Sequence, residues 1–122
     1  MLPGCRCLVL EDEYLIALDI QDMLEGAGAA SVACFSNAEK AMAALNDGAT
    51  FDFAILDVHL GGASRNGLSV AAELTARGTP FIFLTGISHD AARTLGFDAP
   101  FLEKPYQQAT LLEAIGKVIA LE

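Results

Sequence analysis

Five short apolar runs, separated by stretches with helical periodicity, constrain the fold of this chain most strongly. The runs are rich in β-branched, aliphatic and aromatic residues and lie at 7–10, 31–35, 53–56, 81–84 and 101–102. In several of them the apolar residues follow one another without alternation, which is typical of strands that are covered on both faces. A strand-then-helix order repeated along the whole chain predicts an α/β fold, with a parallel sheet between two layers of helices.

The first two stretches between these runs are expected to be helices. In the first, apolar residues recur at helical spacing before the stop signal Gly28. These residues are Ile16, Ile20, Met23, Leu24 and Ala27. The second helix is expected to open with a capping-box pattern over 36–39 and to close before Gly48.

Three further helices complete the alternation. We expect the third over 67–76, the fourth around 89–95 and the last over 107–120. The last has an inward face made by Leu111, Leu112, Ile115, Val118 and Ile119. The fourth has a poor apolar stripe, so we expect it to be the least stable element. The prediction is therefore a doubly wound fold of five strands and five helices.

Length and charge limit the organisation and the partners of the chain. The 122 residues, 53% hydrophobic and 19% charged, suit one domain over 1–122 and argue against disorder. With 16 acidic and 7 basic residues the net charge is -9, which argues against nucleic-acid binding and suits cationic partners or a metal-cation site. No secretory leader or membrane-spanning stretch is apparent, so a cytoplasmic protein without membrane contact is expected. Cys5, Cys7 and Cys34 have no metal-ligand or redox spacing and are expected to be reduced core thiols.

Polar residues with chemical potential follow four of the five runs. Ligands of an open parallel α/β sheet bind beyond the carboxyl ends of its strands, so these residues should meet at one edge. They are Glu11, Asp12 and Glu13 after the first run, Asp57 after the third, Thr85 after the fourth and Lys104 after the fifth. Each has an ordinary explanation when taken alone; Asp12 or Glu13, for example, could cap the first helix. Their occurrence together, in this order, predicts a shared cleft.

The chemistry of this predicted cleft suits a phosphoryl group. Ionised Glu11, Asp12 and Asp57 would repel one another without a counterion, and a few oxygen ligands with retained waters favour Mg²⁺. Lys104 adds a fixed positive charge and Thr85 adds a hydroxyl donor. A metal ion, an ammonium group and a hydroxyl around one carboxylate make Asp57 a candidate nucleophile that takes phosphate as an acyl phosphate.

The ordered motifs strongly resemble the receiver domain of bacterial response regulators, over essentially the whole chain. The motifs that carry the resemblance are Leu8-Val9-Leu10-Glu11-Asp12, Ala54-Ile55-Leu56-Asp57, Phe83-Leu84-Thr85-Gly86 and Lys104-Pro105-Tyr106. The resemblance implies a flavodoxin-like (βα)5 fold of strand order 2-1-3-4-5 and a signalling module that is not an enzyme. The stretch 83–88 also resembles a looser version of the Phe-Ala-Thr-Gly-x-Tyr segment of alphaproteobacterial single-domain receivers, with Leu84 and Ser88 in place of its alanine and tyrosine.

The resemblance further implies roles for single residues in a phosphorelay. Asp57 would take the phosphoryl group from a phosphohistidine on a sensor histidine kinase or a histidine phosphotransfer protein. Asp12 and Asp57 would bind Mg²⁺ directly. The backbone carbonyl of His59 would be a third protein ligand, and Glu11 would act mostly through water.

The resemblance also implies a switch. Thr85 would swing inward to a phosphoryl oxygen, and Lys104 would pair with the same group. Phe101, three residues before Lys104, would turn inward and reshape the surface of the fourth helix, fifth strand and fifth helix for a downstream protein. The Lys104–Pro105 bond is expected to be cis. We expect a monomer or weak dimer, either stand-alone or part of a larger regulator or hybrid kinase.

Three other classes of protein are weaker alternatives. A phosphohydrolase of the haloacid dehalogenase type also combines Asp, Thr, Lys and Mg²⁺, but it needs a second Asp where His59 stands and a cap domain for which 122 residues leave no room. A flavin-binding module needs a phosphate loop after the first run, where the acidic segment 11–13 would repel phosphate. A receiver-like module without phosphorylation would not require the intact set of Glu11, Asp12, Asp57, Thr85 and Lys104.

Overall fold

The computed structural model describes residues 4–58, 64–85, 101–103 and 107–120, and a five-stranded parallel sheet lies at its centre. Its strands are β1 (Arg6–Leu10), β2 (Ser31–Phe35), β3 (Phe53–Val58), β4 (Phe81–Thr85) and β5 (Phe101–Glu103). Their order across the sheet is β2-β1-β3-β4-β5, and every neighbouring pair is parallel. The predicted fold class and strand order are confirmed.

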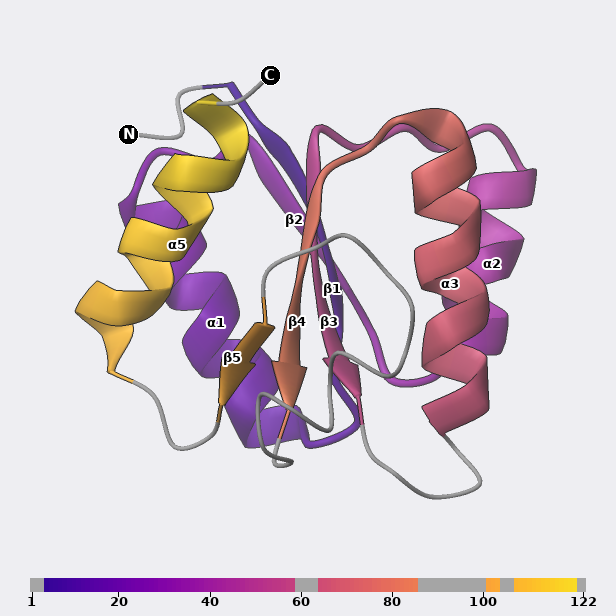
Figure 1. Ribbon diagram of the computed structural model, residues 1–122, viewed down its shortest axis with the longest axis horizontal. Helices are drawn as coiled ribbons and strands as arrows, with labels where there is room; N and C mark the ends of the chain where they lie inside the picture. Colours follow the sequence, from indigo (N-terminus) through magenta and orange to yellow (C-terminus); the bar gives the residue numbers. More distant parts are fainter. Residues whose placement is uncertain (1–3, 59–63, 86–100, 104–106, 121–122) are drawn as a thin grey trace.

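Helices cover both faces of this sheet. The described helices are α1 (Tyr14–Gly26), α2 (Ala38–Asn46), α3 (Ser64–Arg77) and α5 (Gln108–Ala120). α1 and α5 lie on one face and α2 and α3 on the other (Figure 1). The helix expected around 89–95 lies outside the described residues. Among the helices that are described, none combines the length and apolarity that a membrane span requires.

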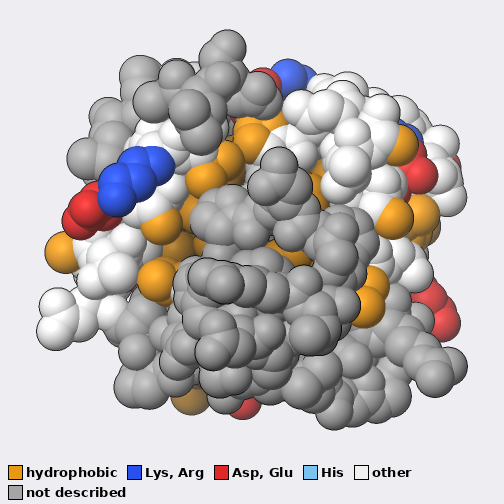
Figure 2. All heavy atoms as spheres, viewed as in Figure 1, with side chains coloured by type: hydrophobic (Ala, Val, Ile, Leu, Met, Phe, Trp, Pro, Cys, Tyr) orange, Lys and Arg blue, Asp and Glu red, His pale blue; other side chains and the backbone are white. Residues whose placement is uncertain are grey.

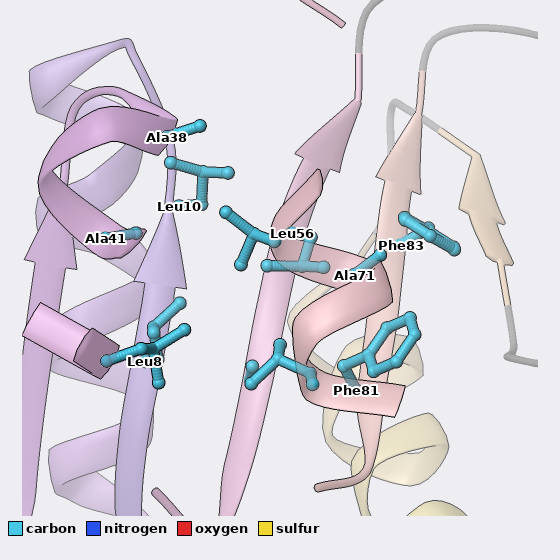
Figure 3. Close-up of a cluster of buried hydrophobic side chains, with 12 residues drawn as sticks. Leu8, Leu10, Ala38, Ala41, Leu56, Ala71, Phe81 and Phe83 are labelled. Atoms are coloured by element: carbon cyan, nitrogen blue, oxygen red, sulfur yellow. The ribbon is translucent and has the colours of Figure 1, made fainter. Parts of the chain in front are cut away.

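Alternation along each strand builds one apolar core on either face. Successive side chains of a strand point to opposite faces, so Leu8 and Leu56 pack against α2 and α3 whereas Val9 and Ile55 pack against α1 and α5. Figure 3 shows the first core, in which strand side chains meet the small Ala41 and other alanines of the helices. Because both faces are buried, the central strands carry apolar residues at consecutive positions, as the sequence indicated.

The ends of several elements differ from those expected. β3 runs to Val58 rather than stopping at 56, because its pairing with β4 continues through Asp57 and Val58. Asp57 therefore lies within the strand and not after it. α3 begins at Ser64, three residues before the expected start. The sequence pattern missed this first turn because residues 64–66 are polar and do not extend the apolar face of the helix.

Side-chain caps explain where α2 begins. Asn37 is its N-cap, and the Asn37 side chain accepts a hydrogen bond from the Lys40 backbone N–H at 2.9 Å. The cap is thus on Asn37 instead of the expected Ser36, and because Lys40 occupies the position where a capping box needs Glu or Gln, α2 has a simple N-cap. Gly28, with φ of 106°, follows α1 in the left-handed conformation that glycine adopts readily, consistent with the predicted stop.

An ion pair links β1 to the segment before β3 at the amino-terminal end of these strands. Arg6 at the start of β1 donates to Asp52 through its backbone N–H at 2.9 Å and through Nε at 3.3 Å. The hydrogen bond from the Arg6 side chain lowers the pKa of Asp52, so this carboxylate stays ionised well into the acid range. The pair ties the segment before β3 to β1 at the end of the sheet opposite to the acidic residues.

The cysteines occupy different environments. All three are free thiols. Cys7 is buried in the core, and burial raises the pKa of its thiol to about 11. The prediction of a core thiol is wrong for Cys34, which is exposed on the edge strand β2. Cys34 has no neighbouring strand on that side in the described part of the sheet, which is why a hydrophobic side chain there gains little burial.

Two leucines of α1 offer a matched test of the core. Leu24 is fully buried and Leu15 is 73% exposed. We expect Leu24→Ala to lower the free energy of unfolding by about 2–5 kcal/mol, because it removes buried methyl groups and leaves a cavity. Leu15→Ala should change it by less than about 0.5 kcal/mol. Urea unfolding followed by circular dichroism measures both, and equal losses would contradict the assigned packing of α1.

Candidate functional site

The register between β1 and β3 brings Glu11 and Asp57 to the same end of the sheet. Val9 of β1 pairs with Ile55 of β3. Two residues further along each chain, the same register sets Glu11 beside Asp57. Asp57 also continues the alternation of Phe53 and Ile55, so it follows the column of β3 that faces α1 and α5. The pairing of Leu10 with Leu56 therefore brings Asp57 of β3 next to Glu11, the residue that directly follows β1.

Three carboxylates gather at this point. Glu11, Asp12 and Asp57 each contribute a carboxylate oxygen, and these oxygens lie within 4.8 Å of one another. The side chains of Glu11 and Asp57 are buried, at 3% and 7% exposure, whereas Asp12 is exposed. The structure thus brings together the three acidic residues that the sequence analysis assigned to a Mg²⁺ site; two of them are buried and one is exposed.

Glu11 is held by hydrogen bonds to two neighbouring elements. Its backbone N–H donates to the carbonyl of Phe35, the last residue of β2, at 3.0 Å. Its side-chain Oε1 accepts the backbone N–H of Glu13 at 3.1 Å. Glu13 is the N-cap of α1, and its carbonyl accepts the Ala17 N–H of the first helical turn at 2.9 Å. Glu11 therefore lies where β1, β2 and α1 meet.

The charges of this acidic cluster favour a bound cation. Two unit charges 4.8 Å apart repel each other by about 3.5 kcal/mol at an effective dielectric constant of 20. A divalent cation removes this repulsion, and hard carboxylate oxygens suit Mg²⁺, which binds to one or two carboxylates and retains several waters. Glu11, Asp12 and Asp57 fit such an ion by ligand type and by spacing.

Of the other predicted site residues, the structure describes the backbone positions of two. The backbone of Thr85, at the end of β4, pairs with Val58 on one side and with Glu103 on the other. Thr85 therefore stands one pair beyond Asp57 at the same end of the sheet. Phe101 begins β5, where its backbone pairs with Phe83. His59, Lys104 and Pro105 lie outside the described residues.

One feature near the site was not foreseen from the sequence. The sequence left open that Asp12 or Glu13 caps the first helix, and Glu13 is indeed the N-cap, yet its side chain makes no capping hydrogen bond. Glu11, two residues earlier, accepts the Glu13 N–H instead. An acid placed two residues before the N-cap is the only sequence signal for this contact, and the same acid was already assigned to the metal site.

The sequence and the fold together define the class of protein. Residues 7–116 match the response regulator receiver domain family. The chain belongs to this family, and the acidic cluster lies on segments within the matched range. The resemblance drawn from the strand-end motifs is thereby confirmed.

Solved structures of other receivers have the same fold. A response regulator receiver protein from Sinorhizobium medicae has 26% identity and a TM-score of 0.81, with 96% of this chain and 95% of that chain covered. The response regulator TrrA from Thermotoga maritima, solved in complex with Mg²⁺ and BeF, has 28% identity and a TM-score of 0.76, covering 93% and 98%. The chemotaxis protein CheY4 of Vibrio cholerae, at 23% identity and a TM-score of 0.80, shares the fold over 94% of this chain and 98% of its own. No curated protein matches this sequence.

The surface agrees with the charge balance of the chain. In the view of Figure 2, the Lys and Arg side chains that are coloured lie apart from one another and form no continuous basic patch among the described residues. Two of the basic side chains are paired with acids along their own helices, Arg77 with Glu73 and Lys117 with Glu113. The described residues on this face do not form the clustered positive charge that nucleic-acid backbones require.

Two Asp→Asn variants test the electrostatics of the acidic cluster. Without Mg²⁺, Asp57→Asn should raise the free energy of unfolding by about 1 kcal/mol, because it removes one of three repelling charges. Added Mg²⁺ should stabilise the unaltered chain more than this variant. Asp52→Asn, which breaks the ion pair with Arg6 at the opposite end of the sheet, should instead lower stability by less than about 1 kcal/mol without changing the response to Mg²⁺. Urea unfolding in EDTA and in excess Mg²⁺ measures these differences. The electrostatic explanation would be contradicted if Asp57→Asn were less stable than the parent chain in EDTA and were stabilised by Mg²⁺ to the same extent as the parent chain.

Proposed function

We propose that residues 1–122 form one receiver domain in which Asp57 accepts a phosphoryl group from a phosphohistidine. The observation that supports this most directly is the position of Asp57. It is a buried carboxylate at the carboxyl end of β3, within 4.8 Å of two further carboxylates, in a chain that belongs to the receiver family. Ligands of doubly wound sheets bind at this end.

The transfer forms one bond and breaks one. A carboxylate oxygen of Asp57 attacks the phosphorus, and a P–O bond forms as the P–N bond to the donor histidine breaks. The electron pair of the P–N bond stays on the imidazole nitrogen, which takes up a proton and leaves as neutral histidine. The product is a mixed anhydride of phosphate and the Asp57 side chain.

Glu11, Asp12 and Asp57 would hold the Mg²⁺ in this proposal. When bound, the ion supplies positive charge that offsets the negative charges of the phosphoryl group and of the carboxylates. The exposed side of the cluster at Asp12 gives a donor access to Asp57, while burial of Glu11 and Asp57 limits competing hydration. The structure of TrrA with Mg²⁺ and BeF supports this assignment by analogy, because that chain shares this fold and family.

Thr85 and Lys104 complete the proposed site. Thr85 ends β4 one pair beyond Asp57, at the carboxyl edge of the sheet, and its hydroxyl is proposed to bind a phosphoryl group on Asp57. Lys104 follows directly on Glu103, the β5 residue that pairs with Thr85, and would contribute its ammonium group to the same anion. The backbone carbonyl of His59, next after Val58, is proposed as a further ligand of the ion.

The phosphoryl group would act as a switch rather than start a turnover cycle. Receiver domains in general are signalling modules that exchange phosphate with histidine kinases or phosphotransfer proteins and then contact a target. In this chain the added negative charge would draw Thr85 toward Asp57 and allow Phe101 to turn inward. The surface around β5 and α5 would then differ between the two states, and a downstream protein would bind one of them.

Intact-mass measurement with a small donor tests this proposal. Incubation with Mg²⁺ and acetyl phosphate should add the mass of one phosphoryl group to the unaltered chain and to Asp52→Asn. Asp57→Asn should gain no mass, because its side chain cannot form the acyl phosphate. Chelation of Mg²⁺ by EDTA should reduce the labelled fraction by at least about tenfold.

The control matches the test residue in type but differs in place. Asp52 is exposed and paired with Arg6 at the far end of the sheet, so its replacement leaves the acidic cluster intact. Equal labelling of Asp57→Asn and the unaltered chain would contradict the proposed function. Continuous release of inorganic phosphate from simple phosphomonoesters would favour the phosphohydrolase alternative instead.

A further inference from the structure

We propose that the outer edge of β2 binds an extended, basic segment of another protein as an additional strand. The binding uses the backbone of β2 and the negative charge of α1, and neither Asp57 nor a cation takes part in it. The inference therefore goes beyond the proposed function and does not depend on it. It gives the chain a second surface for a partner, with a defined chemistry.

Two residues of β2 direct their backbone groups away from the sheet. In the described part of the chain, β2 is an outermost strand and pairs only with β1. The Phe35 carbonyl accepts the Glu11 N–H at 3.0 Å, so Phe35 faces β1. Because successive residues of a parallel strand bond to opposite sides, the N–H and C=O groups of Val32 and Cys34 point outward. No hydrogen bond links these groups to another described residue.

This edge lacks the features with which proteins usually protect an edge strand. Lysine, proline, a bulge or a very short strand normally prevents another strand from pairing there. The five residues of β2 pair with β1 in unbroken register, so the strand has no bulge. No charged residue and no proline occurs between Glu25 and Glu39. Since Cys34 is also exposed, the edge is open to a further strand.

The charge beside this edge favours a basic partner. α1 packs against one face of β2 and carries three exposed acids, Asp19, Asp22 and Glu25. No lysine or arginine occurs between Arg6 and Lys40, so α1 and β2 contain no positive charge that could offset these acids. Lysine or arginine side chains of an incoming segment would supply that charge, which steers association and selects the partner.

Glu25 lies close to the outward-facing part of the edge. The Cys34 thiol donates to Oε1 of Gln21 at 3.7 Å, and Nε2 of Gln21 donates to Oε2 of Glu25 at 3.4 Å. Burial, and after it the negative charge of Glu25, raises the pKa of the Cys34 thiol, so this thiol is uncharged at neutral pH. Side chains of an added strand would alternate between the two faces of the sheet, and every second one would lie on the side of Glu25.

A second copy of this chain fits the edge less well than a basic segment does. If two β2 strands paired antiparallel in one continuous sheet, the α1 helices of both copies would lie side by side on the same face. Their acids would then repel one another, in chains that each carry a net charge of -9. A basic segment forms the same backbone hydrogen bonds and brings attraction instead of repulsion.

Amide exchange with water, followed by nuclear magnetic resonance, tests strand addition. The probe is a short synthetic peptide in which lysine alternates with threonine and valine, added without Mg²⁺ and with a thiol reductant. At a peptide concentration about ten times its dissociation constant, exchange of the Val32 and Cys34 amides should slow by about tenfold. The Ala33 amide faces β1 and is the internal control, so its exchange should not respond to the peptide.

Two further peptides separate strand pairing from charge attraction. Replacement of each lysine by glutamate should weaken binding by at least about tenfold, because like charges then meet. A peptide of the same positive charge with proline at alternate positions should protect neither outward amide, because it lacks the N–H groups that strand pairing needs. Equal protection by the basic and acidic peptides, or by the basic and proline-containing peptides, would overturn the proposal.

Paired variants test the two components of the surface. Cys34→Pro removes an outward N–H and should abolish peptide binding, whereas Cys34→Ser keeps this N–H and should bind as the unaltered chain does. Glu25→Gln leaves the backbone intact and should weaken binding by about threefold. Glu113→Gln is its control, because Glu113 lies on α5, which packs against β4 instead of β2.

Unchanged binding in both Cys34→Pro and Glu25→Gln would contradict the assignment of the β2 edge. The sample without peptide identifies the other possible occupant. If protection of the Val32 amide rose with protein concentration and Cys34→Pro abolished it, a second copy would occupy the edge, and the assignment of a basic partner would be overturned.

Discussion

Mutual repulsion among Glu11, Asp12 and Asp57 is the constraint on which the proposed function depends. Ionised carboxylate oxygens within 4.8 Å of one another repel, and burial of two of the side chains strengthens this repulsion. The apolar cores on both faces of the sheet supply the stability that keeps these charges together. The arrangement makes sense for a site that binds a cation and then a phosphoryl group.

The sheet itself does most of the positioning. Parallel pairing places the carboxyl ends of β1, β3, β4 and β5 at one edge, and the alternation of each strand decides which face a side chain takes. The register of β1 with β3 pairs Leu10 with Leu56, so that Glu11 and Asp57 follow at the same end, and that of β3 with β4 sets Val58 beside Thr85. A shift of one residue in either strand would turn an acid into the core and a leucine into the site.

Much of this could be predicted from the sequence, because strand position and residue type carry most of the information. The consecutive apolar runs indicated a doubly covered sheet, and the acids at the ends of two runs indicated a cation site. Strand ends were less accurate: β3 includes Asp57 because its pairing with β4 outweighs the low strand preference of aspartate. The bond from Glu13 to Glu11 was not predicted, because it depends on the path of the chain between β1 and α1 and on no residue pattern.

The most direct test of the central claim locates the modified atom. Borohydride reduces an acyl phosphate of aspartate to homoserine, so a chain treated with Mg²⁺ and a phosphodonor, then reduced and digested, carries a chemical mark at the phosphorylated residue. We predict homoserine at position 57, with Glu11, Asp12 and Glu13 unchanged. Reduction at one of those acids instead, or no reduced residue in a chain that has bound Mg²⁺, would contradict it.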